Sequence, residues 1–231
     1  SRFRCLPMPV ASPPLLIAAL DAGSNAIRAV VARAASATEI RELASARWPV
    51  RPGHGAFTRK QLDPRTMTRA VEVFWKFRNL LNRYDIGEYY AVATSAVREA
   101  ANREALISRI RRETGVDLVA IDAREEARLA RVAVFSVATS QFAPRAIVDL
   151  GGGSLEISFL RGRRVVQDLA MPLGSVRLME TYDLAGSFTP NAFARLRRHV
   201  VSVLKSHGRA ASFPGRRAVV ACGGNAEALA R

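Results

Sequence analysis

The chain has 231 residues, of which 49% are hydrophobic and 24% are charged, a balance typical of a globular protein with a core of its own. Its longest apolar run is far shorter than the roughly 18–20 residues of a membrane-spanning helix, so we expect no membrane span. Two cysteines (Cys5 and Cys222) and three histidines are too few and too scattered for a disulfide framework or a histidine-based metal site. We therefore expect a cytoplasmic protein with unpaired thiols.

The net charge of the chain is strongly positive. Thirty-five Lys and Arg residues stand against 20 Asp and Glu residues, which gives a formal charge of +15. A charge of this sign attracts polyanions, so polyphosphate, nucleotides, nucleic acid and anionic membrane surfaces are all candidate partners. Because lysine occurs at three positions alone (Lys60, Lys76 and Lys205), a general preference for arginine is an equally good explanation of much of the excess.

The first residues, Ser1–Cys5, contain two arginines ahead of a weakly apolar stretch. A signal peptide is one interpretation, but Pro13 and Pro14 interrupt the apolar stretch and no clear cleavage site follows. We expect a disordered segment that leads into the first strand.

Hydrophobic patterns predict the secondary structure of the first half in chain order. A strand that begins at residue 15 ends at a turn near Asp21, strands follow at 27–32 and 38–50, and 51–64 is a polar loop. Apolar side chains at helical spacing predict a long helix over 65–84, begun by Asp63 and Pro64. The other elements of this half are a strand at 89–94, a helix after 95, a helix over 103–114 capped by Asn102 and ended by Gly115, a strand at 116–121 and a helix over 122–138.

The second half repeats this order of elements. Strands are predicted at 146–150, 156–160 and 164–171, a helix at 190–206, and a last strand at 217–221 before a helix from 226. The repeated plan predicts an α/β protein of two similar lobes, with residues 1–136 in the first lobe and 137–231 in the second.

A glycine-containing turn with a leading aspartate follows the first strand of each half. The first turn reads Asp21-Ala-Gly23-Ser24-Asn25, and the second reads Asp149-Leu-Gly151-Gly152-Gly153-Ser154-Leu-Glu156. Glycines allow backbone N–H groups to converge on an anion, and the serines add hydroxyl donors. The aspartates offer oxygen ligands to a hard cation such as Mg²⁺. Two turns of the same chemistry predict a site that closes on a phosphate chain.

Four segments, in order and at consistent spacing, resemble the exopolyphosphatase/guanosine pentaphosphate phosphohydrolase group. They are Asp21–Asn25, Ala93–Asn102, Glu125–Leu129 and Asp149–Glu156, and Pro172–Leu178 is similar to the segment that follows in that group. The resemblance spans nearly all of 15–231 and implies a two-lobed, actin-like ATPase (ribonuclease H-like) fold with mixed sheets flanked by helices. It also implies that the last helices of the second lobe are absent, so we expect that lobe to be truncated at its C-terminus.

The resemblance further implies Mg²⁺-dependent hydrolysis of terminal phosphoanhydride bonds in inorganic polyphosphate or pppGpp. Glu126 occupies the position of the family's catalytic glutamate and is expected to activate water. Asp149 and Glu156 are expected to assist catalysis and to hold the metal, with a less certain contribution from Asp21. Substrate binding is expected at both turns and at one guanidinium group, that is, at Asp21, Gly23, Ser24, Asn25, Arg98, Gly151, Gly152, Gly153 and Ser154.

Two departures from the family pattern leave other functions open. Leu155 stands where the family usually has Thr, and Gly223-Gly224-Asn225 replaces a Ser-Gly-Thr turn, so hydroxyl groups near the phosphates are lost. One alternative is therefore a catalytically weakened regulator that binds polyphosphate or a nucleotide. Another is an ATPase or kinase of the same superfold, because the third turn is compatible with an adenosine pocket.

The expected partners follow from the charge and the resemblance. Polyphosphate or a guanosine penta- or tetraphosphate is favoured, whereas nucleic acid is permitted by the charge without being favoured. A homodimer is a reasonable expectation. Arg177 is expected to be either a cation of the substrate channel or a solvated side chain.

Overall fold

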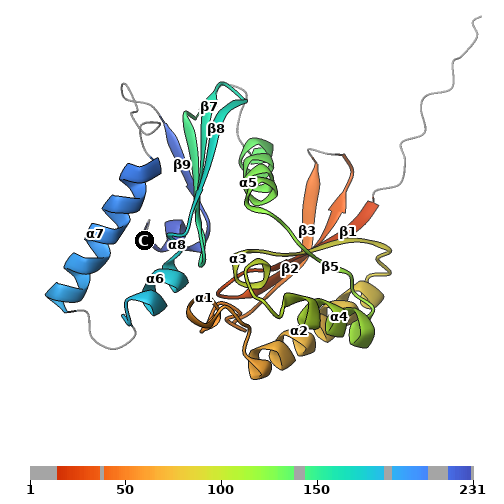
Figure 1. The fold of residues 1–231 in the computed structure, drawn as a ribbon. Coiled ribbons are helices and arrows are strands. Elements are labelled where there is room, and N and C mark those ends of the chain that lie inside the picture. Colours follow the sequence, from red (N-terminus) through yellow and green to blue (C-terminus); the bar gives the residue numbers. More distant parts are fainter. Residues whose placement is uncertain (1–14, 37–38, 138–143, 185–188, 208–217, 230–231) are drawn as a thin grey trace, which may run out of the picture.

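The chain is built around two β-sheets, each with its own helices (Figure 1). A computed structural model describes residues 15–36, 39–137, 144–184, 189–207 and 218–229. The predicted lead-in segment at the N-terminus and Cys5 lie outside the described residues. Lobe I denotes the first sheet with helices α1–α4, and lobe II denotes the second sheet with helices α5–α8.

The first sheet has five strands in the order β3-β2-β1-β4-β5. β1, β2 and β3 form an antiparallel meander, whereas β4 and β5 continue the sheet in parallel with β1. The strands are β1 (Leu15–Ala22), β2 (Ile27–Ala34), β3 (Ile40–Trp48), β4 (Glu88–Ala93) and β5 (Leu118–Ala120). The helices of lobe I are α1 (Ala56–Arg59), α2 (Pro64–Arg83), α3 (Ser95–Arg98) and α4 (Arg103–Thr114).

The long helix α2 begins as the sequence predicts and contributes its two largest buried side chains to the core of lobe I. The side chain of Asp63 accepts hydrogen bonds from the N–H groups of Arg65 and Thr66, and Pro64 occupies the first turn. Its apolar stripe, which includes Phe74 and Phe77, is fully buried beneath the sheet. Phe77 also contacts the ring of Tyr89 edge-on, with centroids 5.9 Å apart.

The second sheet has four strands in the order β8-β7-β6-β9, and it repeats the plan of the first. β6, β7 and β8 are antiparallel neighbours, and β9 pairs with β6 in parallel. The strands are β6 (Ala146–Leu150), β7 (Leu155–Arg161), β8 (Arg164–Met171) and β9 (Val219–Cys222). The helices are α5 (Ala123–Val137), α6 (Ser175–Thr181), α7 (Pro190–His207) and α8 (Gly224–Leu229).

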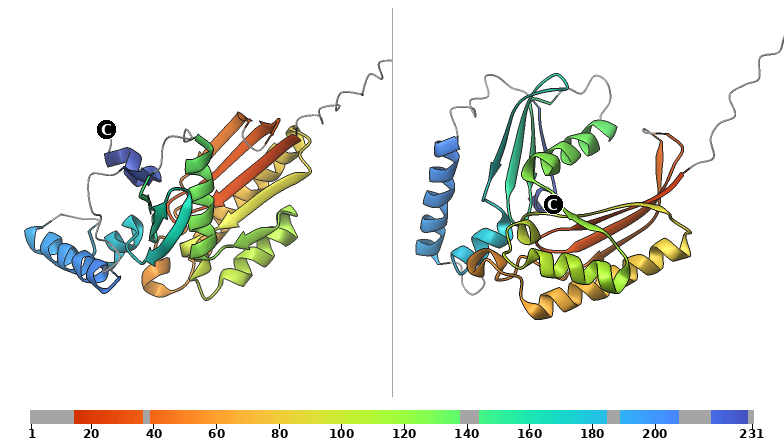
Figure 2. Two further views of the ribbon diagram at one scale, coloured as in Figure 1. Left: turned by 90° about the horizontal axis from the view of Figure 1, so that it is seen from above. Right: turned by 45° about the vertical axis from the view of Figure 1, so that its right-hand side comes forward.

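Helix α5 connects the two sheets and lies on the side of the second sheet that faces lobe I (Figures 1 and 2). Val134 and Phe135 in its last turns pack against Ile147 and Leu160 of the second sheet. The predicted division at 136/137 stays a prediction, although this packing groups α5 with the second sheet. Helix α7 lies along the outer side of lobe II, and none of its side chains is buried.

Three local expectations need correction. The predicted loop over 51–64 contains the short helix α1, which buries Ala56 and Phe57. Asn102 precedes α4, but its side chain bonds both backbone groups of Leu62 instead of capping the helix (Oδ1 from Leu62 N–H, 2.8 Å; Nδ2 to Leu62 O, 2.9 Å). The sequence did not predict α6. The predicted end of α4 at Gly115, which has a φ of 65°, is confirmed.

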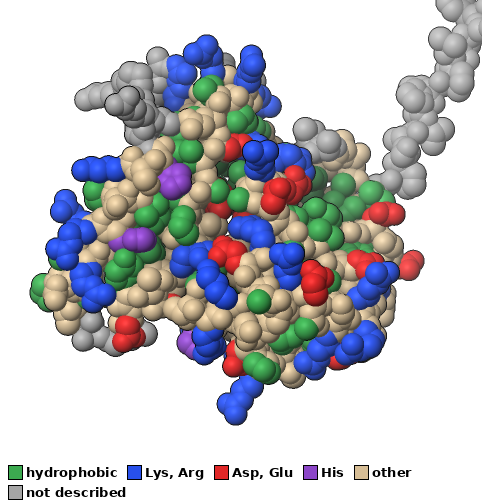
Figure 3. Space-filling view, viewed as in Figure 1, with side chains coloured by type: hydrophobic (Ala, Val, Ile, Leu, Met, Phe, Trp, Pro, Cys, Tyr) green, Lys and Arg blue, Asp and Glu red, His purple; other side chains and the backbone are tan. Residues whose placement is uncertain are grey.

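Basic side chains gather at two places on the outside of lobe II. Figure 3 shows Lys and Arg side chains over the tip of the β7–β8 hairpin and along α7. The exposed arginines of these two regions are Arg161, Arg163, Arg164, Arg195, Arg197 and Arg198. Among the described residues, no helix combines the length and apolar character needed to cross a membrane.

Candidate functional site

The first glycine loop, Gly23–Asn25, follows β1 and is supported by backbone groups of lobe I. The carbonyl of Ser24 accepts a hydrogen bond from the N–H of Gly53 (2.7 Å), and the carbonyl of Asn25 accepts one from Arg51 (3.1 Å). The Ser24 hydroxyl is buried and bonds the Ser95 hydroxyl at the start of α3 (3.0 Å). The loop is therefore fixed by neighbours that all belong to one lobe.

The second glycine loop, Gly151–Ser154, joins β6 to β7 and is supported in part by side chains. The N–H of Gly151 donates to the carbonyl of Ser154 (3.0 Å), which closes the turn. Asn225 Nδ2 donates to the carbonyls of Leu150 (2.7 Å) and Gly151 (3.2 Å). The third turn, which the sequence identified as unusual, thus holds the second loop through its asparagine.

The two loops meet across the gap between the lobes. A β-carbon added at Gly152 would lie 3.0 Å from Ser24 Cβ, and one added at Gly153 would collide with Ser95 and Phe57. The backbone of the second loop thus approaches side chains of lobe I so closely that Gly153 has no room for a β-carbon. The structure therefore brings the two predicted loops together as facing walls of one site.

A cavity of about 710 Å³ lies between the loops. It is wide enough for a chain of several phosphates or a nucleotide. The cavity is lined by Asp21, Gly23, Ser24, Asn25, Ala26, Arg28, Arg47, Thr94, Ser95, Glu126, Asp149, Leu150, Gly151, Gly152, Gly153, Ser154, Ser175, Gly223, Gly224, Asn225 and Ala228. Of the predicted site residues, all but Arg98 and Glu156 are in this lining.

Four carboxylates from four elements gather at the cavity, and three of them line it. Asp149 and Glu156 are partners across the β6–β7 ladder, so their side chains share the face of the sheet that α5 covers. Glu126 projects from the first turn of α5, and Asp21 from the end of β1. The negative charge of Glu126 raises the pKa of both Asp21 and Glu156.

Burial is the main cause of the raised pKa values in this cluster. It raises the pKa of Glu156 to about 7 and that of Asp21 to about 6, with further contributions from Glu126 in both cases. The side chain of Asp21 is exposed to solvent in the open cavity, so water moderates the rise of its pKa. The pKa values of Glu126 and Asp149 are also raised, again mainly by burial.

Glu156 has the chemistry of a metal ligand without a partner. It is 2% exposed, and neither of its carboxylate oxygens forms a hydrogen bond within the part of the chain that the structure describes. The Ser154 hydroxyl is close enough to offset part of the pKa rise, although it falls outside hydrogen-bond geometry. A buried, unpaired carboxylate is costly unless a cation neutralises it, so Glu156 with Asp149 fits a hard divalent cation.

No set of three or more Asp, Glu, His or Cys side chains in the described segments has the arrangement of a complete metal site. A cation held by Asp149 and Glu156 would need further ligands from water or from a bound phosphate. This is the usual situation of Mg²⁺, which keeps several waters and few protein ligands. The residues present therefore fit Mg²⁺, and its presence stays a prediction.

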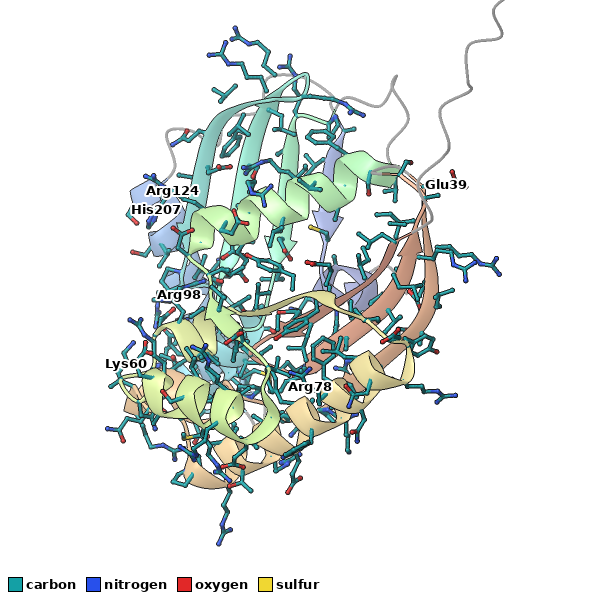
Figure 4. The ribbon with its side chains drawn as sticks, turned by 90° about the vertical axis from the view of Figure 1, so that its right-hand side faces the viewer. Glu39, Lys60, Arg78, Arg98, Arg124 and His207 are labelled. Atoms are coloured by element: carbon teal, nitrogen blue, oxygen red, sulfur yellow. The ribbon has the colours of Figure 1, made fainter. Side chains whose placement is uncertain are left out.

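Arg98 pairs with Glu126 below the first turn of α5. Its Nη1 donates to Glu126 Oε2 (2.9 Å) and to the carbonyl of Ile121 (2.9 Å), and it does not line the cavity. Figure 4 shows it beneath the first turn of α5. The guanidinium group lowers the pKa of Glu126 and so opposes the effect of burial. Its contacts make it a support of Glu126, and a direct contact with phosphate stays a prediction.

Arg28 and Arg47 line the cavity, although the sequence analysis did not select them. The strand register places Asp21 opposite Arg28 and Arg28 opposite Arg47, so a carboxylate and two guanidinium groups form one row across the sheet. Arg28 could have been identified from the sequence, because a hairpin that turns at Gly23–Ala26 sets Asp21 opposite Arg28. Arg47 required the register of the third strand, which the sequence does not give.

Comparisons with known proteins agree with this geometry. The model of the Ppx/GppA phosphatase family matches residues 30–231. Exopolyphosphatase 1 of Mycobacterium tuberculosis is 31% identical over 69% of this chain and 46% of its own length. An uncharacterised protein of Streptomyces coelicolor is 29% identical over 92% of this chain and 63% of its own length. The chain thus spans 46–63% of the length of these relatives.

Solved structures share the same arrangement of lobes. The crystal structure of an exopolyphosphatase-like protein superposes with a TM-score of 0.84 at 26% identity, over 92% of this chain and 67% of that one. The Aquifex aeolicus PPX-GPPA enzyme superposes with a TM-score of 0.72 at 25% identity, over 92% of this chain and 69% of that one. The predicted two-lobed, actin-like α/β fold is confirmed, and the chain belongs to the Ppx/GppA phosphatase family.

Proposed function

We propose that this chain is a divalent-metal-dependent hydrolase that removes terminal phosphate from inorganic polyphosphate or from the 5′ end of pppGpp. The observation that carries the proposal is the meeting of two glycine loops over a carboxylate-lined cavity. Family membership and the relatedness to exopolyphosphatase 1 support it. The positive net charge of the chain is also suited to a long polyanion.

In the proposed reaction, backbone N–H groups of the two loops hold the phosphate oxygens. Water attacks the terminal phosphorus, its oxygen becomes part of the released phosphate, and the bridging P–O bond breaks with its electron pair on the shortened chain. Glu126 accepts the proton of the attacking water. The raised pKa of Glu126 brings it nearer to neutrality, which suits a general base, and Arg98 orients the carboxylate.

Asp149 and Glu156 are the proposed holders of Mg²⁺. When bound, the cation would neutralise phosphate charge and relieve the repulsion among the four carboxylates. Burial of Glu156 without a hydrogen-bond partner supports this assignment. A homodimer and a cytoplasmic location stay predictions.

The chief alternative is a regulator that binds polyphosphate or a nucleotide but turns it over weakly. Leu155 and the Gly223-Gly224-Asn225 turn were the reasons to consider it. Neighbouring residues of a strand point to opposite faces, and Leu155 is absent from the cavity lining, whereas the three residues of the turn are part of it. The loss of a hydroxyl at Leu155 therefore gives little support to weak binding. The third turn also has a supporting role through Asn225, which an adenosine pocket of a kinase would not require.

The test is phosphate release from long-chain polyphosphate and, in a parallel assay, from pppGpp, each with and without Mg²⁺. Glu126→Gln should lower turnover by about 10²–10⁴-fold and leave polyphosphate binding intact. Glu125→Gln is the matched control, because Glu125 is one residue away and pairs with Arg128 (2.7 Å) outside the cavity. Binding by the wild-type chain without any release of phosphate would favour the regulator.

A further inference from the structure

Arg177 in the first turn of α6 contacts both lobes at once. Its Nε donates to the carbonyl of Gly153 in the second glycine loop (2.6 Å), and its Nη2 donates to Glu99 Oε1 of lobe I (2.6 Å). The guanidinium carbon lies 4.1 Å from the centroid of the Phe57 ring, also in lobe I. The side chain is 12% exposed and is not part of the cavity lining. Neither sequence-based expectation, a channel cation or a solvated side chain, matches these contacts.

The contact with Gly153 determines the direction of a peptide group. In a planar trans peptide the C=O and the following N–H point in opposite directions. Arg177 holds the carbonyl of Gly153 from the α6 side, so the N–H of Ser154 is turned to the other side of the loop. The backbone N–H of Arg177 holds the carbonyl of Gly152 in the same way (3.0 Å), which turns the N–H of Gly153.

These two N–H groups are donors without an acceptor. Among the described residues, the N–H groups of Gly152, Gly153 and Ser154 form no hydrogen bond. The carbonyls of Gly151, Gly152 and Gly153, in contrast, all accept hydrogen bonds, from Asn225 or from residues of α6. Ser154 and both glycines line the cavity. Successive free N–H groups of this kind form an anion-binding nest.

The same helix carries a second contact with lobe I. Glu180 Oε1, near the end of α6, accepts a hydrogen bond from the N–H of Gly55 (2.6 Å) and lies 3.3 Å from His54 Nδ1. Lys60 lies 3.9 Å from the other oxygen of Glu99. Helix α6 is thus attached to lobe I at both ends while its first turn supports the loop of lobe II.

We propose that Arg177 is a positioning residue that orients the anion-binding N–H groups of the second glycine loop and makes this orientation depend on contact between the lobes. Glu99 and Phe57 fix the guanidinium group from lobe I, and the group in turn fixes the Gly153–Ser154 peptide. Loss of the contact between the lobes would release this peptide and weaken phosphate binding. The identity of the ligand as a phosphate rests on the proposed function.

The test compares Arg177→Met and Arg177→Lys with the wild-type chain, and Arg197→Met on the exposed surface of α7 is the control. Tripolyphosphate binding is measured by calorimetry, and the amide signals of Gly152, Gly153 and Ser154 by NMR without ligand. Arg177→Met should weaken binding by about 10- to 100-fold and shift these amide signals, because charge-assisted hydrogen bonds are lost. Arg177→Lys should restore part of the binding, because the charge toward Glu99 is retained.

A second variant keeps the proposal testable if Arg177→Met does not fold. Glu99→Gln leaves Arg177 and Gly153 in place but weakens the attachment to lobe I, so it should change the same amide signals and weaken binding by less. Unchanged signals and binding in both variants would overturn the proposal. If the wild-type chain binds no tripolyphosphate, the proposed function fails, and the amide signals still decide the role of Arg177.

Discussion

The two glycine loops have similar sequences but different supports. Backbone N–H groups of Gly53 and Arg51 hold the carbonyls of the first loop, and no substitution of a side chain removes these donors. The second loop is held by the backbone N–H groups of Ser175 and Arg177 in α6 and, in addition, by the side chains of Asn225 and Arg177. The first loop is therefore a fixed wall of the cavity, and the second is a wall whose geometry can change when lobe contacts change.

The two lobes also differ in the size of their hydrophobic cores. The core of lobe I is a single large cluster in which α2 and α4 pack against the sheet. The buried cluster of lobe II, within the described residues, consists of Val134, Ile147 and Leu160, with four partly buried neighbours. Lobe II has less apolar burial of its own, so its loop relies more on contacts with lobe I.

The largest effect on stability is expected in the core of lobe I. Phe77→Ala removes a fully buried ring and should lower the free energy of unfolding by about 3–5 kcal/mol. Leu160→Ala in lobe II should cost closer to about 2 kcal/mol, because its smaller cluster can collapse around the cavity. Urea unfolding of both variants measures the difference. An equal loss of unfolding free energy in both variants would contradict the conclusion that lobe I has the larger core.

A smaller loss is expected where the two loops meet. A methyl group at Gly153 would collide with Ser95 and Phe57, so Gly153→Ala should cost about 2–3 kcal/mol and separate the loops. Gly151→Ala is the matched control, since its β-carbon would meet one atom, the carbonyl oxygen of Ser154, at 3.4 Å. Thermal unfolding and tripolyphosphate binding check both variants. Similar behaviour of the two would show that the loops do not meet as described.

The fold was predictable because its signals are local. Apolar spacing gives α2, Asp63 and Pro64 give its beginning, and the two aspartate–glycine turns give the loops. The short helices α1 and α6 were missed because four and seven residues carry too little periodicity. The role of Asn102 was predicted wrongly because its side chain bonds the backbone of Leu62, 40 residues away, instead of an N–H group at the start of α4.

The candidate site was predictable as a set of residues but not as a set of contacts. The loops, Glu126 and Asp149 do line one cavity. Arg98 pairs with Glu126, and Arg177 pairs with Glu99, across elements that are far apart in the sequence. Neither composition nor the spacing of residues predicts such pairs. In a chain with this many arginines, only the folded arrangement separates a supporting guanidinium group from a solvated one.

The smallest expected effect on stability comes from the carboxylate of Glu156, which is buried in lobe II. The pKa of Glu156 is raised to about 7 from a usual 4.5, so the folded state binds a proton more tightly than the unfolded state. Without metal, this group makes the protein lose stability as the pH rises from about 4.5 to 7. Glu156→Gln removes the effect and should stabilise the metal-free protein at pH 8 by about 1–2 kcal/mol, with little change at pH 4.5.

Added Mg²⁺ should reverse the order of these two proteins. The cation would neutralise the Glu156 carboxylate and raise the unfolding temperature of the wild-type chain, whereas the glutamine variant should respond weakly. Unfolding temperatures at pH 4.5 and 8, with and without Mg²⁺, provide the measurement. Ser158→Ala on the same strand is the control, since it alters a buried polar group and leaves the carboxylates intact. An equal response to Mg²⁺ in wild type and Glu156→Gln would mean that the cation binds elsewhere, and the second loop would then have to hold phosphate beside an uncompensated carboxylate.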